Sequence, residues 1–147
     1  MVELKNRVEG EKNGSSKPLN ALVFGTGGAS RAAIYVLHKH GIAVTQVSRT
    51  ADEIRGIISY DDLKKRALCE FQLLVNATPL GMYPAIDTKP DLNYEQLTEA
   101  HFLYDLVYNP AETAFLREGK RRNCGVQNGL PMLHAQAEAA WQIWAAI

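Results

Sequence analysis

Short apolar segments alternate with longer segments of helical periodicity from residue 20 onward. The apolar segments are bounded by Gly or polar residues, which is typical of strands buried on both faces of a parallel sheet. They predict strands at 21–25, 43–48, 57–59, 72–76, 102–106 and 124–127. The intervening segments predict helices at 29–40, 60–67, 93–97, 111–119 and 130–146. Right-handed crossovers then give an α/β fold, a doubly wound, Rossmann-type and mostly parallel sheet of about six strands.

Two segments add detail to this pattern. About seven residues separate Thr50 from Ile57, too few for a crossover helix, so we expect a loop or a single turn there, leaving the adenine side of a cofactor site open. The last helix carries apolar residues at helical spacing, which predicts core packing against the sheet. These residues are Leu130, Leu133, Ala137, Ala140, Trp141 and Trp144.

The domain organisation follows from composition. Residues 1–19 are polar, with a short helix expected within 2–9 and a linker-like cluster at 13–18, and residues 20–147 form one domain.

The formal net charge is zero, so composition suggests neither nucleic acid nor a membrane surface as a partner. The N-terminus has no apolar core of a signal peptide, and no apolar run approaches the length of a membrane span. Two cysteines and four histidines show no metal-ligand spacing, so no metal is expected and the reducing cytoplasm fits.

The first predicted strand runs into a glycine-rich turn. Gly25, Thr26, Gly27, Gly28 and Ala29 stand between that strand and a helix-forming segment, and Ser30 occupies the usual third small position. Such a turn presents backbone N–H groups and a helix N-terminus to a pyrophosphate. The strand before it and the helix after it favour a dinucleotide site.

The second predicted strand indicates which dinucleotide. It ends in Ser48, Arg49 and Thr50, where readers of NAD usually carry an acid that binds the ribose 2′-hydroxyl. An acid would repel a 2′-phosphate, whereas a guanidinium and a hydroxyl can bind one. The sequence therefore predicts NADP as the cofactor.

Three later segments, in this order, raise the specificity. They are Val75–Met82 (VNATPLGM), Tyr104–Thr113 (YDLVYNPAET) and Asn128–Ala137 (NGLPMLHAQA). Together with the glycine turn and the Ser-Arg-Thr segment, they resemble the C-terminal half of the shikimate dehydrogenase family, the NADP-dependent oxidoreductases of aromatic amino-acid biosynthesis. The resemblance covers residues 20–146 and leaves residues 1–19 unmatched.

The resemblance implies roles for individual residues. Residues 25–29 would hold the diphosphate, and Arg49 with Thr50 the 2′-phosphate. Asn76 and Thr78 would lie against the cofactor, and the backbones of Leu106 and Gly129 would meet its nicotinamide end. Tyr108 and Gln136 match the two residues that this domain contributes to the site for shikimate or 3-dehydroshikimate.

Two departures from the family pattern qualify these expectations. Ala51, Asp52 and Glu53 follow the Arg-Thr pair where the family often has a second basic residue, and the next cation is Arg55. The family's catalytic Lys–Asp pair and its carboxylate-binding serines belong to an N-terminal domain that does not precede residue 20. No catalytic residue is therefore assigned, and the isolated chain is expected to be inactive. A non-catalytic dinucleotide-binding module and a quinate-specific dehydrogenase remain alternatives.

The same missing domain predicts an exposed apolar surface at the carboxyl edge of the sheet. We expect it around Leu80, Met82, Leu106 and Tyr108, where that domain would cover it or where the chain would self-associate.

Overall fold

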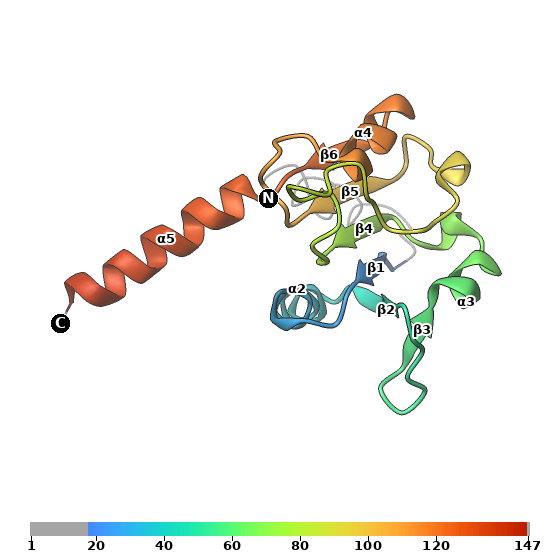
Figure 1. Ribbon diagram of the computed structural model, residues 1–147. Helices are drawn as coiled ribbons and strands as arrows, with labels where there is room; N and C mark the ends of the chain where they lie inside the picture. Colours follow the sequence, from blue (N-terminus) through green and yellow to red (C-terminus); the bar gives the residue numbers. More distant parts are fainter. Residues whose placement is uncertain (1–17, 147) are drawn as a thin grey trace.

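The computed structural model describes residues 18–146, which form a single parallel sheet flanked by helices (Figure 1). The strands are β1 (Asn20–Phe24), β2 (Ala43–Ser48), β3 (Ile57–Ser59), β4 (Leu73–Asn76), β5 (Phe102–Asp105) and β6 (Gly125–Gln127). They lie in the order β3-β2-β1-β4-β5-β6. The chain therefore winds outward from β1 in one direction and then from β4 in the other, which confirms the doubly wound α/β fold.

The helices are α2 (Gly28–Lys39), α3 (Tyr60–Lys64), α4 (Ala114–Arg121) and α5 (Leu130–Ala145), with short 3₁₀ segments η2 (Leu68–Glu70) and η3 (Tyr94–Gln96). All six predicted strands are present within one residue of their expected ends. The 93–97 helix is reduced to the single turn η3, and η2 was not expected. The predicted helix at 2–9 lies outside the described residues.

Alternating strand residues face two separate apolar layers. On one face Leu22, Leu74 and Leu103 pack with Leu63 of α3 and Phe115 of α4. On the other face the core contains the alternate strand residues and residues of α2, namely Ala21, Val23, Val75, Leu37 and Ile34. Both faces of the central strands are thus covered, as their continuous apolar runs predicted.

The segment between β2 and β3 is a tight loop, as expected from its length. Asp52 and Ile57 exchange two backbone hydrogen bonds, at 2.9 Å each, which fold residues 53–56 into a turn. Ile54 is fully exposed at its tip. No helix crosses between these two neighbouring strands.

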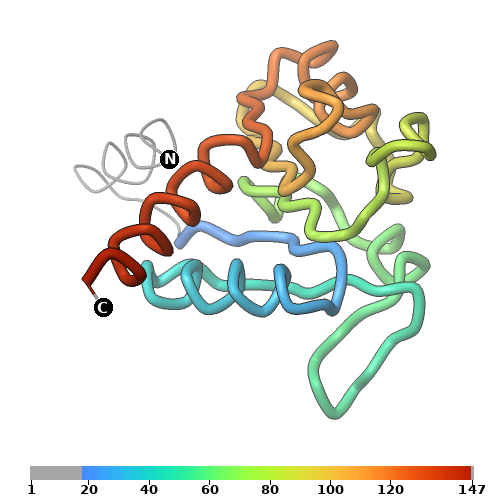
Figure 2. The backbone as a smooth tube through the Cα atoms, turned by 60° about the vertical axis from the view of Figure 1, so that its left-hand side comes forward, coloured from blue at the N-terminus to red at the C-terminus, as the bar shows by residue number. Residues whose placement is uncertain are grey.

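Helix α5 contradicts the prediction of core packing. None of its 16 residues is buried, and Trp141 and Trp144 are 70% and 69% exposed. The helix projects from the end of β6 beyond the sheet (Figure 1), and the tube trace in Figure 2 follows it to the C-terminus. Apolar spacing shows that a helix has an apolar face, but it does not show whether that face packs on its own domain.

No helix within residues 18–146 has the length and apolar character needed to cross a membrane.

Candidate functional site at the carboxyl edge of the sheet

The carboxyl ends of the central strands lie side by side. Phe24 of β1 pairs with Val47 of β2 on one side and Asn76 of β4 on the other, and Asn76 pairs with Asp105 of β5. The residues that follow these strands therefore share one edge of the sheet. In doubly wound sheets ligands bind at this edge, where the winding direction reverses, and here that point lies between β1 and β4.

The glycine turn after β1 lies close to the backbone that follows β4. Gly25 has φ +109°, and a Cβ on it would lie 2.8 Å from the carbonyl oxygen of Ala77, so any larger residue would strain the turn. The Gln46 side chain donates from Nε2 to the Gly25 carbonyl at 2.7 Å. Buried Ser30 donates from Oγ to the Gly27 carbonyl at 2.8 Å. The third small position is thus occupied by a hydroxyl that fixes the turn.

The N-terminus of α2 is open toward this edge. Its N-cap, Gly27, supplies no side chain to the first N–H groups, and the first turn contains no acidic residue. A Cβ on Gly27 or Gly28 would meet no atom within 4 Å, and Thr26, Gly28 and Ala29 are exposed. Backbone donors at the positive end of a helix dipole therefore face solvent, which suits an anionic phosphate.

A cation follows the end of β2, the strand that pairs with β1. Arg49 and Thr50 are exposed, directly after half-buried Ser48. Asp52 accepts a hydrogen bond from the backbone N–H of Arg55 at 3.1 Å and lies 4.0 Å from its guanidinium. The acid that departs from the family pattern thus has its own cationic neighbour, although exposed pairs of this kind interact only weakly.

Tyr60 contacts both the core and this cationic corner. Its ring stacks on Phe24 with centroids 6.0 Å apart. Burial raises the pKa of Tyr60, Asp91 raises it further, and the positive charge of Arg49 opposes both. The Arg49 guanidinium is therefore close enough to the Tyr60 phenol for their charges to interact.

The loop after β4 is fixed by side chains that the sequence singled out. The Asn76 carboxamide oxygen accepts from Thr78 N–H at 3.1 Å and from Thr78 Oγ1 at 2.6 Å. Its amide nitrogen donates to the Leu80 carbonyl at 3.1 Å. Asn76 is fully buried, and these hydrogen bonds from its side chain shape residues 77–80.

Leu106 and Gly129, expected at the same end of the cofactor, are brought into contact. A Cβ on Gly129 would lie 2.1 Å from the Leu106 carbonyl oxygen, so only glycine fits. The Gly129 N–H donates to the Val107 carbonyl at 3.2 Å. The start of α5 is thereby held against the loop after β5.

The two expected substrate residues are both exposed. Tyr108 lies in the loop after β5 and is 48% exposed, and Gln136 is exposed on α5. Within the described part of the chain no hydrogen bond joins them. Of the apolar residues expected at this edge, Met82 is exposed with Tyr108, whereas Leu80 and Leu106 are half-buried.

Sequence reasoning missed three residues that shape this edge. Gln46 was a candidate strand residue only, and Asp105 and Thr113 were parts of a motif without an assigned role. Burial raises the pKa of Asp105 to about 6, against hydrogen bonds from Thr113, Val107 and Asn76 that lower it. For Asp105 the available signal was its place as the last residue of a buried strand, because a polar residue there needs a partner inside the protein.

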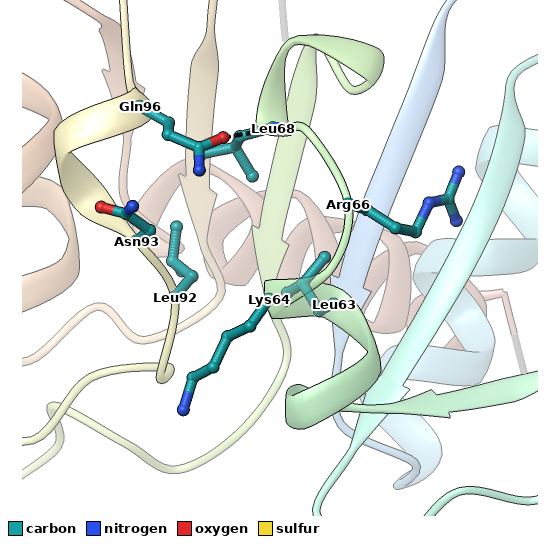
Figure 3. Close-up of a pocket in the computed structure, with 7 residues that line it drawn as sticks. All are labelled: Leu63, Lys64, Arg66, Leu68, Leu92, Asn93 and Gln96. Atoms are coloured by element: carbon teal, nitrogen blue, oxygen red, sulfur yellow. Dashed lines mark hydrogen bonds between the residues drawn. The ribbon is translucent and has the colours of Figure 1, made fainter.

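A shallow hollow elsewhere contains none of these residues. It lies between α3 and the segment around η3, as Figure 3 shows. Its lining comprises Leu63, Lys64, Arg66, Leu68, Leu92, Asn93 and Gln96. The Gln96 side chain accepts from the Leu68 N–H at 2.9 Å, and Lys64 pairs with Asp91 at 2.6 Å. Because its polar groups already have partners and its leucines belong to the core, we interpret it as a shallow surface depression between packed side chains.

Comparison with known proteins finds similar sequences among shikimate dehydrogenases, although no protein-family profile matches the chain. The NADP⁺-dependent shikimate dehydrogenase of Methanococcus aeolicus is 34% identical over 146 residues, which cover 91% of this chain and 52% of that enzyme. That of Clostridium beijerinckii is 39% identical over 132 residues, covering 84% of this chain and 47% of the enzyme.

A solved structure agrees. The shikimate 5-dehydrogenase of Thermus thermophilus, crystallised with NADP(H) and shikimate, superposes with a TM-score of 0.73 at 36% identity, covering 97% of this chain and 56% of that one. The chain thus spans about half the length of the relatives it matches. In sequence and in fold it is similar to one half of the shikimate dehydrogenases, which confirms the family resemblance that its motifs predicted.

Proposed function

We propose that this chain binds NADP(H) at the carboxyl edge of its sheet, as the cofactor-binding half of a shikimate dehydrogenase. The observation that carries the proposal is the open N-terminus of α2 directly after the tight turn at Gly25, with exposed Arg49 directly after the neighbouring strand β2. Backbone N–H groups would hold the diphosphate, and Arg49 with Thr50 would bind the 2′-phosphate. The NADP⁺-dependent relatives support this choice of cofactor.

Calorimetry with NADP⁺ and NAD⁺ tests the cofactor choice. A charge-assisted contact to the phosphate should favour NADP⁺ by about tenfold to a hundredfold. Arg49→Ala should remove most of that preference, whereas Arg117→Ala, which removes an exposed cation from α4, should leave it intact. Equal affinities in the unaltered chain would exclude the 2′-phosphate assignment.

The reaction we propose for the complete enzyme is the reversible interconversion of shikimate and 3-dehydroshikimate in aromatic amino-acid biosynthesis, in the cytoplasm. NADP supplies the hydride transfer when bound. From this chain, the Tyr108 phenol and the Gln136 amide would hydrogen-bond the polyhydroxylated acid. Those two groups serve quinate as well, so they leave the choice of substrate to residues outside this chain.

The isolated chain should be inactive even if it binds the cofactor. Reduction or oxidation at a carbinol carbon needs a group that carries the hydroxyl proton, and a phenol and an amide are poor bases near neutral pH. Loss of general acid–base catalysis alone lowers rates by about a hundred- to ten-thousand-fold. Positioning by the rest of the substrate site would be lost as well.

We propose the substrate-binding half of the enzyme as the partner of this chain. Its contact surface would include α5, whose Trp141, Ile143 and Trp144 are all at least 65% exposed, together with Met82 and Tyr108. Exposed apolar surface of this kind marks a protein interface or promotes self-association. The half-length match to the relatives favours the complementary domain over a second copy.

An activity assay with and without that domain tests this assignment. Chain supplemented with, or fused to, the other half of a relative should oxidise shikimate, and chain alone should not. Turnover by the purified chain alone would show that a base lies within it, with Lys17 and His134 the first to replace. NADP⁺ binding without turnover in the fused protein would favour a non-catalytic binding module. Dimerisation of the chain alone through α5 would favour self-association.

A further inference from the structure

Three polar side chains form a fully buried cluster at the ends of β4 and β5. Asn76, Asp105 and Thr113 have no exposed surface. Burying a carboxyl group is unfavourable unless hydrogen bonds replace its contacts with water. The cluster is fully bonded, since no buried side-chain nitrogen or oxygen of the described residues lacks a partner.

Asp105 is the centre of this cluster. One carboxylate oxygen accepts from the Asn76 amide and from the Val107 N–H, at 3.0 Å each. The other accepts from Thr113 Oγ1 at 2.5 Å. Every one of these partners is a donor, and a carboxylate is the side chain that can accept from all of them at once.

The three donors belong to three segments that meet at the carboxyl edge. Asn76 fixes the loop at 77–80, through its bonds to Thr78 and Leu80. Val107 lies between Leu106 and Tyr108, and its carbonyl receives the Gly129 N–H. Thr113 is the N-cap of α4, where its Oγ1 also accepts from the Leu116 N–H. One carboxylate thus links the loop after β4, the loop after β5 and the start of α4.

We propose that Asp105 is a positioning residue for the nicotinamide end of the cofactor site. It acts through Asn76, Val107 and Thr113 and touches neither cofactor nor substrate. This inference rests on the proposed function, because the linked loops carry Thr78, Leu106 and Tyr108. The adenine end, at Arg49, follows β2 on the far side of β1, and the three donors to Asp105 all come from other segments. Loss of the carboxylate should therefore weaken binding of the nicotinamide end alone.

The test compares two ligands that share the 2′-phosphate end. Calorimetry would measure binding of NADPH and of adenosine 2′,5′-bisphosphate, which lacks the nicotinamide. Asp105→Asn keeps the shape but replaces one acceptor oxygen with a donor. It should weaken NADPH binding by about tenfold, as for loss of one hydrogen bond to a charged group, and leave the bisphosphate within about twofold.

A second pair of variants covers the case in which Asp105→Asn does not fold. Thr113→Val removes the hydroxyl at nearly constant shape and should shift the ratio of the two affinities in the same direction, whereas Thr113→Ser retains the hydroxyl and should leave the ratio unchanged. Tyr94→Phe is the matched control, because it removes another buried hydrogen bond, from the Tyr94 hydroxyl to the Pro90 carbonyl at 2.7 Å. That change should lower stability without altering the ratio.

The outcomes are separable. An unchanged NADPH affinity in Asp105→Asn, or an equal loss for both ligands, would overturn the positioning role while the proposed function stands. If the unaltered chain bound neither ligand, the proposed function would fail and this inference with it. A shifted ratio in Thr113→Val together with an unchanged ratio in Thr113→Ser would support the inference independently of Asp105.

Discussion

Helices α2 and α5 both carry many apolar residues, yet only α2 packs any of them into the core. Leu37 of α2 is buried in the core, and Ile34 packs against that layer. Helix α5 is longer, with 16 residues against 12, and buries none of them. Helix α2 gains its stability from the sheet. Because most helical stability in proteins comes from packing, α5 has no comparable source within the described part of this chain.

This difference separates what the domain needs to fold from what it offers to a partner. Helix α2 contributes Leu37 and Ile34 to the core, and its N-terminus is free for an anion. The α5 side presents two indoles and an isoleucine to solvent. We interpret α5 as a helix whose covering surface is supplied by the other half of the proposed enzyme.

The largest expected effect comes from truncating one apolar side chain in each helix. Leu37→Ala should lower the free energy of unfolding by about 2–4 kcal/mol, because it removes buried contacts and leaves a cavity. Trp144→Ala should change it by no more than about 0.5 kcal/mol, since the indole is 69% exposed. Urea denaturation followed by far-UV circular dichroism would measure both. A large loss in Trp144→Ala would show that α5 packs on the domain after all.

A pH titration sharpens the comparison, because the sheet contains the buried carboxyl group of Asp105, whereas α5 contains no buried residue. The folded-state pKa of Asp105 is raised to about 6 by burial, above the ordinary value of about 3.9 in the unfolded chain. The folded state therefore holds this proton more tightly, and its contribution to stability falls as the pH rises from about 4 to about 6. The decrease is at most about 3 kcal/mol.

The variant Asp105→Asn isolates this contribution. Hydrogen bonds with Ser59 and Lys65 lower the pKa of Asp62 to about 2, and partners also lower the pKa values of Glu112 and Glu118. These groups act in the opposite direction, since their stabilisation is lost as the pH falls, but they are present in both proteins. Unfolding free energies of the original chain and the variant should therefore diverge between about pH 4 and 6. Parallel curves would exclude the raised pKa.

The smallest expected effect is a change in tryptophan fluorescence. The only two tryptophans, Trp141 and Trp144, both lie on α5, so indole fluorescence reports on that helix alone. Emission should already resemble that of a solvated indole in the folded chain and change little when urea unfolds the sheet, while circular dichroism shows the transition. Addition of the complementary half should shift the emission to shorter wavelength. A strong shift on unfolding of the chain alone would mean that the indoles were already buried.

Much of this protein could be predicted from local sequence patterns. The apolar runs determined the six strands and their parallel arrangement, because a strand buried on both faces leaves few polar positions. The glycine turn at Gly25 and the Ser-Arg-Thr segment determined the candidate phosphate contacts, since backbone conformation and side-chain charge are properties of the residues themselves. The short segment before Ile57 correctly excluded a crossover helix, because chain length limits what can form.

Other features were decided only by the tertiary structure. Asp105 and Thr113 became a buried cluster because strand register brought Asn76 beside Asp105, a pairing between residues 29 apart in sequence. The contact of Gly129 with Leu106 likewise depends on how β6 returns to the sheet. Helix α5 shows the limit most clearly. Its apolar spacing predicted core packing, and that prediction was wrong because none of its residues is buried. Whether an apolar face packs on its own sheet depends on surfaces that periodicity does not encode.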